Sequence, residues 1–404
     1  MNDHQENTSQ NTPATRLQIL LELFGVSAKL GLTSFGGPVA HLGYFHEAYI
    51  RRRKWLDERS YADLVALCQL LPGPASSQVG IGIGIHRAGL IGGIIAWIGF
   101  TLPSAAALVL FALLLQGLDL GGAGWIHGLK IVAVVIVAHA ILGMGQKLTP
   151  DRNRITVAVT AAAVSLMWQT VFTQVILIGV AALIGMKWYA PKEIPEAGPP
   201  AVQLNRKLAA GCLVLFAGLL IVVPLLRPFF ASGWLALFDS FYRAGSLVFG
   251  GGHVVLPMLE REVVPAGWVS REDFLAGYGA AQAVPGPLFT FAAYLGAMKG
   301  GLAGAAMATA AIFLPAFLLV AGTLPFWDDL RRLPGVQGAL SMVNAAVVGI
   351  LLAALYDPLW TSAILAPADF ALAAILFVLL VFWKLPPWVI VIAGAGGGIL
   401  LNYL

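Results

Sequence analysis

The chain contains one short motif twice, and both copies carry groups that could bind an anion. The copies are Gln69 with Pro72-Gly73-Pro74, and Gln282 with Pro285-Gly286-Pro287. Proline has no amide donor and stops a helix. A helix that restarts after each break therefore directs free N–H groups and the positive end of its dipole toward the break, where an anion can bind. The restarting turns also contain the hydroxyls of Ser76 and Thr290.

A glycine-rich step in an apolar stretch precedes each motif. The two steps are Ser34-Phe35-Gly36-Gly37 and Phe249-Gly250-Gly251-Gly252. In lipid, backbone without helical partners persists only where it is buried in protein or lines a wet cavity. Two matched breaks in two matched halves therefore indicate a transporter's binding site. The alternatives are that the glutamines only cap broken backbone and that the glycines serve close helix packing.

Two cations occupy matched places ahead of these steps, Lys29 in the first copy and Arg243 in the second. Ionisable groups within apolar segments are costly and are often functional. If both approach one central site, their charge favours an anion, and a divalent one in particular. Alternatively, they extend to the membrane interface or pair with Glu22 and Asp239.

Four other ionisable residues are candidates for a gate or for proton coupling. Histidine and carboxylate side chains can change charge within the accessible pH range after modest shifts. Lys130 lies near the end of its apolar segment, so it could equally extend to the interface. A buried histidine with satisfied hydrogen bonds is the alternative for the histidines. The candidates are Lys130, Glu22, His139 and His253.

The elements that must position these residues are membrane helices. Of the 404 residues, 59% are hydrophobic and 11% are charged, and the mean hydropathy is +0.83. Soluble domains carry roughly 25% charged residues. Stretches such as 89–116 and 208–226 have the length and apolarity of a membrane span. The composition predicts an all-α polytopic membrane protein.

The motifs recur with a period of about 210 residues, which predicts a duplicated transporter half. The loop 46–60 is rich in arginine, whereas its counterpart 260–273 is mainly acidic. Because basic loops stay cytoplasmic, the first loop is expected inside and the second outside, as in an inverted repeat with re-entrant, broken helices. The predicted segments are a cytoplasmic tail (1–16), an N-terminal repeat (17–188), a cytoplasmic linker (189–207) and an inverted C-terminal repeat (208–404).

Signals of enzymatic chemistry are lacking. The chain has no phosphate-binding glycine-lysine loop and no paired-histidine metal motif. We therefore expect no catalytic residue, metal or cofactor. The basic residues lie in short loops, so a nucleic-acid partner is not expected either.

At the motifs above, the sequence resembles the long, two-domain chromate ion transporters. The resemblance is carried by 30–38, 69–74, 249–252 and 282–287, and it extends over about 24–145 and 238–355. It implies export of chromate across the bacterial inner membrane, driven by the electrochemical gradient, and chromate resistance. Sulfate is the chemically similar dianion. The first copy has Pro38 where the second has Gly252, so the halves need not be equivalent.

The leading hypothesis is a secondary oxyanion transporter in the lipid bilayer, with its N-terminus in the cytoplasm and its site near the midplane. The residues predicted to bind the dianion are Lys29, Arg243, the two glutamines, the two glycine-rich steps, the two proline-glycine-proline breaks, Ser76 and Thr290. An oxyanion channel, a sulfate uptake or exchange carrier, and a membrane-bound chromate reductase are the alternatives. The sequence leaves the oligomeric state open, with a homodimer as one option.

Overall fold

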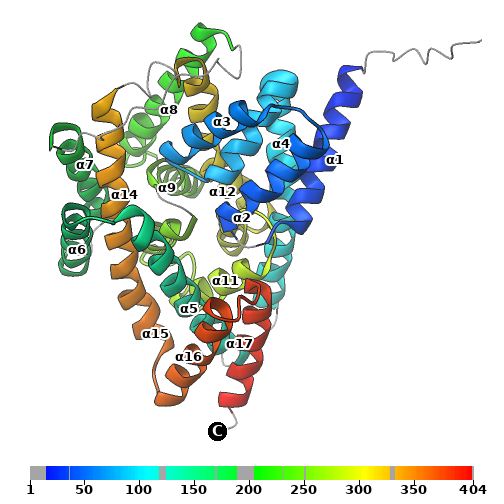
Figure 1. Ribbon diagram of the computed structural model, residues 1–404. Coiled ribbons are helices and arrows are strands. Elements are labelled where there is room, and N and C mark those ends of the chain that lie inside the picture. The colour runs from blue at the N-terminus through cyan, green and yellow to red at the C-terminus, as the bar shows by residue number, and fades with distance from the viewer. Residues whose placement is uncertain are drawn as a thin grey trace, which may run out of the picture.

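The computed structural model describes residues 15–35, 37–117, 124–168, 171–188, 204–230, 232–249, 252–327 and 333–402. Helices form the first half in the order α1 (Arg16–Thr33), α2 (Gly37–Phe45), η1 (His46–Arg52), α3 (Glu58–Leu70), α4 (Ala75–Gly117), α5 (Gly124–Leu148), α6 (Arg152–Met167) and α7 (Val171–Trp188). The second half begins with α8 (Arg206–Leu226), α9 (Gly233–Leu247), η2 (Gly252–Val254), α10 (Val255–Val263), α11 (Arg271–Ala283), η3 (Leu288–Thr290) and α12 (Phe291–Thr323). It ends with η4 (Leu324–Phe326), α14 (Pro334–Ala354), η5 (Leu355–Trp360), α15 (Thr361–Ala363), α16 (Pro367–Val381) and α17 (Pro387–Leu401) (Figure 1).

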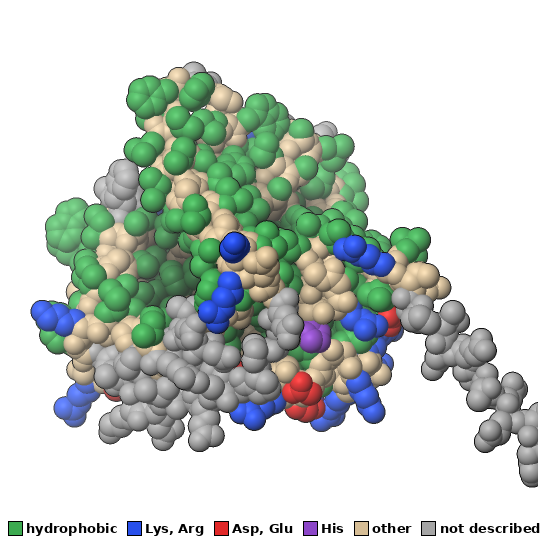
Figure 2. Space-filling model, turned by 90° about the horizontal axis from the view of Figure 1, so that it is seen from above, with side chains coloured by type: hydrophobic (Ala, Val, Ile, Leu, Met, Phe, Trp, Pro, Cys, Tyr) green, Lys and Arg blue, Asp and Glu red, His purple; other side chains and the backbone are tan. Residues whose placement is uncertain are grey.

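The protein is an all-α polytopic membrane protein, and the described residues form no strand. Five helical segments are long and apolar enough to cross a bilayer: 75–116, 124–148, 206–226, 288–326 and 335–363. On α8, Val214 and Leu225 are 71% and 64% exposed, as expected for side chains that face lipid rather than water. Figure 2 shows an end of the molecule at which much of the surface is hydrophobic.

Each proline-glycine-proline break is the bend of a helical hairpin. In the first half α3 leads into the break, and α4 leads away beside it, with Gly82 against the Leu64 side chain. In the second half Gly277 of α11 lies against the ring of Tyr294 in α12. Both contacts join residues at similar distances before and after the break, so the two arms run antiparallel.

A second sharp turn follows in each half, because α4 and α12 are both interrupted. The backbone leaves helical geometry at Ala88 and Gly89 in α4, and at Gly300 and Gly301 in α12. Gly89 and Gly301 have φ of +67° and +59°, values that glycine adopts readily. These turns separate a short arm from the long membrane-crossing helix.

Pairs of glycines hold the arms together beyond these turns. Gly84 meets the backbone of Gly92 in α4, and Gly296 meets that of Gly304 in α12. Contacts this close require residues without a Cβ atom, the packing that small residues allow between membrane helices. The two halves therefore share one local architecture, as the repeated motifs predict.

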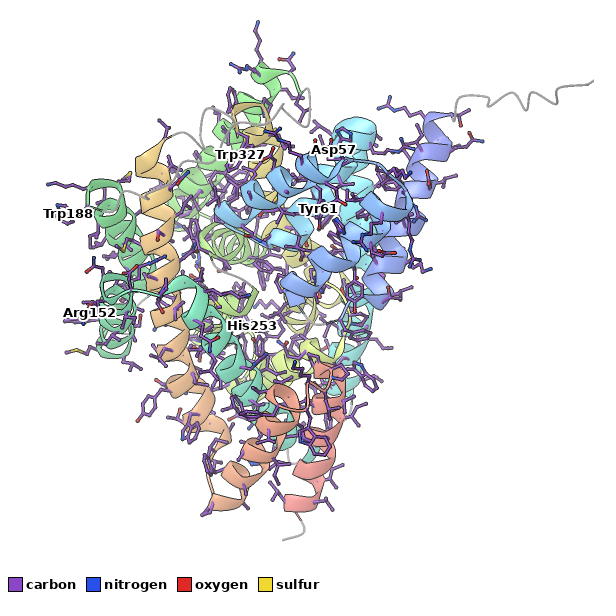
Figure 3. The ribbon with its side chains drawn as sticks, viewed as in Figure 1. Asp57, Tyr61, Arg152, Trp188, His253 and Trp327 are labelled. Carbon is purple, nitrogen blue, oxygen red and sulfur yellow. The ribbon has the colours of Figure 1, made fainter. Side chains whose placement is uncertain are left out.

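Tryptophans pack against cations at both turns. The Arg87 guanidinium lies 5.3 Å from the ring centroid of Trp55, and the Lys299 ammonium lies 5.5 Å from that of Trp268. The hairpin arm α3 lies toward the top of Figure 1, and its counterpart α11 lies toward the bottom. In Figure 3, Asp57 and Tyr61 lie in the region of α3, and His253 lies nearer the centre of the molecule.

The predicted tail and linker fall largely outside the described residues, and so do Gly36, Gly250 and Gly251. The apolar helices α16 (Pro367–Val381) and α17 (Pro387–Leu401) are shorter than the five segments that are long enough to cross a bilayer. At the start of α16, the Asp369 carboxylate accepts hydrogen bonds from the backbone N–H groups of Leu365 and Ala366.

Candidate functional site

The four repeated motifs meet in crossed pairs. The Gly73 N–H of the first break donates to the Val248 carbonyl at 2.6 Å, and the Gly286 N–H of the second break donates to the Ser34 carbonyl at 2.9 Å. Ser34 and Val248 are matched residues that end α1 and α9 in extended conformation. Each break thus donates to the helix end that belongs to the other half. This reciprocal pairing relates the two halves of the crossing by a pseudo-two-fold axis.

Only glycine fits at the centre of each break. Gly73 and Gly286 have φ of +112° and +99°, well outside the range that side-chain-bearing residues favour. A Cβ atom on Gly286 would lie 2.9 Å from the Ser104 Oγ atom, and one on Gly73 would lie 3.2 Å from the Gln78 Nε2 atom. The glycines thus permit close approach of the long helices α4 and α12 to the crossing.

The restarting end of α4 is polar and buried. The Ser76 hydroxyl lies 3.2 Å from Nδ1 of His41, and the Gln78 amide donates to the Pro72 carbonyl at 2.7 Å. The Ser34 hydroxyl is buried without a hydrogen-bond partner. Pro74 is also buried, and Pro72 and Phe35 are half-buried.

The corresponding end of α12 is more apolar. The Thr290 hydroxyl donates to the Pro287 carbonyl at 2.7 Å and so caps its own turn. The Gln282 side-chain nitrogen is buried without a partner. Pro285 and Phe249 are half-buried. Gln69, the counterpart of Gln282, has an exposed side chain, so the two glutamines do not occupy equivalent surroundings.

The two matched cations have different surroundings. Lys29 lies on the exposed face of α1, and among the described residues its ammonium group makes no hydrogen bond or ion pair. Arg243 donates to Asp239 at 2.9 and 3.0 Å and to Glu262 at 3.0 Å. Arg227 completes this cluster, 3.1 Å from Asp239. The predicted alternative of an Arg243–Asp239 pair is therefore the one that the structure contains.

The other ionisable candidates are scattered, with one exception. Glu22 is half-exposed and lies 3.7 Å from both Arg53 and Arg87 rather than near Lys29. Lys130 is half-buried on α5. The exception is His253, whose Nδ1 atom lies 2.7 Å from the Tyr278 hydroxyl. His139 lies exposed on α5.

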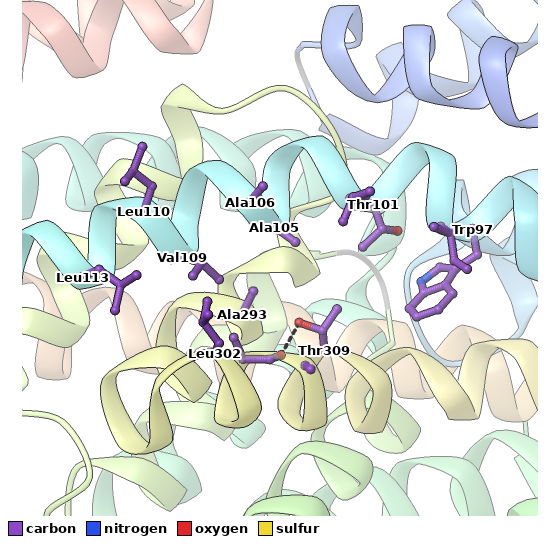
Figure 4. A pocket seen from close by; sticks show the side chains of 14 residues that line it. Trp97, Thr101, Ala105, Ala106, Val109, Leu110, Leu113, Ala293, Leu302 and Thr309 are labelled. Atoms are coloured by element: carbon purple, nitrogen blue, oxygen red, sulfur yellow. Dashed lines mark hydrogen bonds between the residues drawn. The ribbon is translucent and has the colours of Figure 1, made fainter.

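A groove of about 520 Å³ lies between α4 and α12. Apart from Thr101 and Thr309, its lining is hydrophobic (Figure 4). The Thr309 hydroxyl already donates to the Ala305 carbonyl. A dianion placed there would lose its hydration without gaining donors, so the groove is a poor site for the anion. Among the described residues, no cluster of histidine, cysteine or carboxylate side chains is arranged to hold a metal.

Sequence reasoning missed His41, Gln78 and Thr101, which are buried near the first break. A comparison of the halves could have found them. His41 matches Val255 at the spacing that relates Lys29 to Arg243, and the polar run Ala75–Gln78 matches Leu288–Phe291. Polar residues present in only one copy of a repeat indicate a role specific to that copy.

Comparison with known proteins agrees with the geometry. The family model described as chromate transporter matches residues 21–186 and 235–399. The chromate transport protein of Pseudomonas aeruginosa is 28% identical over 350 residues, which cover 83% of this chain and 80% of that protein. The chromate transport protein of Cupriavidus metallidurans is 28% identical over 331 residues, covering 80% of this chain and 78% of that protein. No solved structure matches the chain.

Proposed function

This chain belongs to the chromate transporter family, and from that premise we propose that it is a secondary transporter that exports chromate across the inner membrane and confers chromate resistance. The chain would bind the dianion at the crossing of the two breaks. The observation that carries the proposal is the exchange of hydrogen bonds between Gly73 and Val248 and between Gly286 and Ser34. It supports a single central site built by both halves, where broken helices of transporters bind their substrates.

We further propose that the two halves are inverted, with the pseudo-two-fold axis in the membrane plane. The contrast between the arginine-rich loop 46–60 and the acidic loop 260–273 supports this orientation, with the N-terminus in the cytoplasm. The position of α11 below α3 in the view of Figure 1 is consistent with this orientation. The repeats would be residues 17–188 and 208–404.

Alternating access would then rock one half against the other around the crossing. The turns at Gly89 and Gly301 lie at matched places in the two halves. Arg87 packs on Trp55 at the first turn and Lys299 packs on Trp268 at the second, and each contact is suited to close one entrance. Cation–π contacts of this kind are worth about 0.5–2 kcal/mol. Such contacts can form and break during a transport cycle.

The charged residues would act at a distance. Arg243 is neutralised by its ion pairs with Asp239 and Glu262, and Lys29 is exposed. We propose that both shape the electrostatic potential along the path of the anion rather than contact the anion. His139 and His253 are the candidates for coupling to protons.

Purified protein in liposomes tests the proposal. Chromate flux is measured under imposed pH and voltage gradients, with sulfate as the competing dianion. A carrier predicts saturable flux, exchange of internal for external chromate, and a dependence on the imposed gradient. Flux that rises linearly with chromate and shows no exchange would indicate a channel. No flux under any gradient would refute transport by this chain.

A further inference from the structure

Buried polar atoms without a hydrogen-bond partner gather at the first break. Ten such side-chain atoms occur in the described part of the chain, and five of them belong to residues at this break. Each of the five residues is at most 2% exposed: Ser34, His41, Ser77, Gln78 and Thr101. Four of these atoms can donate a hydrogen bond, whereas the Gln78 Oε1 atom can only accept one. Because burying an unpaired polar atom costs free energy, the four donors call for a partner that is bound from outside the chain.

His41 connects two of the motifs that meet at the crossing. Its Nδ1 atom lies 3.2 Å from the Ser76 hydroxyl in the first turn of α4, and its ring lies within hydrogen-bonding reach of the Ser34 backbone. Its Nε2 atom has no partner. If Nδ1 accepts from Ser76, Nε2–H is a free donor, and in the other tautomer the Ser76 O–H is free. Either way, one donor of the pair is left for a group outside the pair, which is either the Ser34 backbone or a ligand.

The second break closes the opposite side. The Gly286 N–H donates to the Ser34 carbonyl at 2.9 Å, and a Cβ atom on Gly286 would lie 2.9 Å from the Ser104 Oγ atom. Ser104 in turn donates to the Thr101 carbonyl at 3.0 Å. Gly286 therefore contacts the Ser34 backbone and, through Ser104, the helix α4.

The start of α4 adds backbone donors. The Gln78 N–H donates to the Pro74 carbonyl and is the first amide of α4 with such a partner. The preceding N–H groups of 75–77 have no helical partner, as at any helix start. The Ser77 hydroxyl, buried and unpaired, belongs to the same turn.

The second half has hydrophobic residues at most of the matched places; the exception is Thr290, which matches Ser77 but whose hydroxyl already donates to the Pro287 carbonyl. The replacements are Val248 for Ser34, Val255 for His41, Phe313 for Thr101 and the run Leu288–Phe291 for Ala75–Gln78. Their bulky members are buried. The backbones of the two halves are thus alike at the crossing, but the side chains of the first half are mainly polar there and those of the second half are mainly apolar.

We propose that the transported oxyanion is bound on the first-half side of the crossing by uncharged donors, with Ser34, His41 and Ser77 as specificity-determining residues at the start of α4. This inference rests on the proposed function and deepens it. The ligand class is a tetrahedral oxyanion, whose oxygens can accept several converging hydrogen bonds. Hydrogen bonds to an ionised acceptor are the strong ones, so the site needs no lysine or arginine. The second half contributes the Gly286 backbone and a hydrophobic wall.

Ser77→Ala and His41→Val test this assignment, with chromate KM in proteoliposomes as the readout. Ser246→Ala is the matched control, because Ser246 is equally buried but its hydroxyl donates to the Tyr242 carbonyl within α9. We expect KM to rise about tenfold in each site variant, as expected for the loss of one hydrogen bond to a charged ligand. The control should keep the wild-type KM, and His41→Gln, which retains an amide donor, should recover part of the loss.

Thermal unfolding in detergent separates binding from folding. Removal of an unpaired buried hydroxyl by Ser77→Ala should leave the melting temperature of the ligand-free protein unchanged or higher, while abolishing its increase on addition of chromate. A lower melting temperature with the chromate-induced increase intact would overturn the inference, because it would show a structural role. Wild-type KM in both site variants would also overturn it. If wild-type protein itself carries no chromate, the proposed function fails instead.

Discussion

The substitution Gly286→Ala tests whether the crossing of the two breaks is needed for transport. At φ of +99°, a residue with a side chain is strained, which costs about 1–3 kcal/mol. The new Cβ atom would lie 2.9 Å from the Ser104 Oγ atom, and overpacking of this kind costs about 1–3 kcal/mol. The reduced entropy of the unfolded chain returns about 0.4–1 kcal/mol.

The net destabilisation of the crossed conformation is therefore about 3 kcal/mol at the middle of these ranges. Because each 1.4 kcal/mol changes an equilibrium about tenfold, we expect initial rates of chromate flux to fall by at least about tenfold. The assay is chromate flux in proteoliposomes with equal amounts of folded protein. Gly267→Ala is the control, since Gly267 also has positive φ (+67°) but a Cβ atom there meets nothing within 4 Å. Wild-type rates in a folded Gly286→Ala protein would refute the reasoning.

Three further substitutions probe the charged residues. Asp239→Asn weakens the buried pairing with two arginines, and since Asp239 is 1% exposed we expect a loss of about 3–5 kcal/mol; an unchanged unfolding midpoint would contradict this. Lys29→Gln should change chromate KM less than about threefold, with the effect vanishing at high salt; a large, salt-independent loss would place Lys29 on the anion itself. Trp268→Leu removes the ring under Lys299 and should speed modification of the Lys299 amine by an amine-reactive reagent, followed by mass spectrometry, relative to the wild-type protein; equal modification rates would exclude a closing role for this contact.

The parts of the fold that the sequence predicted depend on local chemistry. Two prolines on either side of a glycine interrupt a helix, so both breaks were predictable; the single prolines Pro103 and Pro315 remain within α4 and α12. The turns at Gly89 and Gly301 were not predicted, although both use the positive φ that glycine supplies. Apolar length alone marked the membrane-crossing helices.

The different surroundings of Lys29 and Arg243 could not be predicted from their matched positions. Arg243 is held by Asp239 and Glu262. At the same spacing, the first half has Gly25 in place of Asp239 and Ala48 in place of Glu262. Without these carboxylates Lys29 stays on the exposed face of α1. A repeat conserves the backbone path, but the partners of each side chain depend on tertiary contacts.

The crossed pairing was also beyond sequence reasoning, because it is a contact between segments far apart in the chain. The repeat indicated that the motifs belong together, but it could not show that Gly73 pairs with Val248 rather than with its own half. His41 was missed for the same reason. Its importance depends on the nearby Ser76 hydroxyl and on the absence of any partner for Nε2.

The most direct test of the central claim is the position of the bound ion. Crystals of the protein soaked in chromate would give an anomalous scattering peak from chromium. The account predicts one peak at the crossing, within hydrogen-bonding reach of the donors around Ser34, at a position lined by both halves. A peak in the groove between α4 and α12, or beside Lys29, from protein that transports chromate would contradict it.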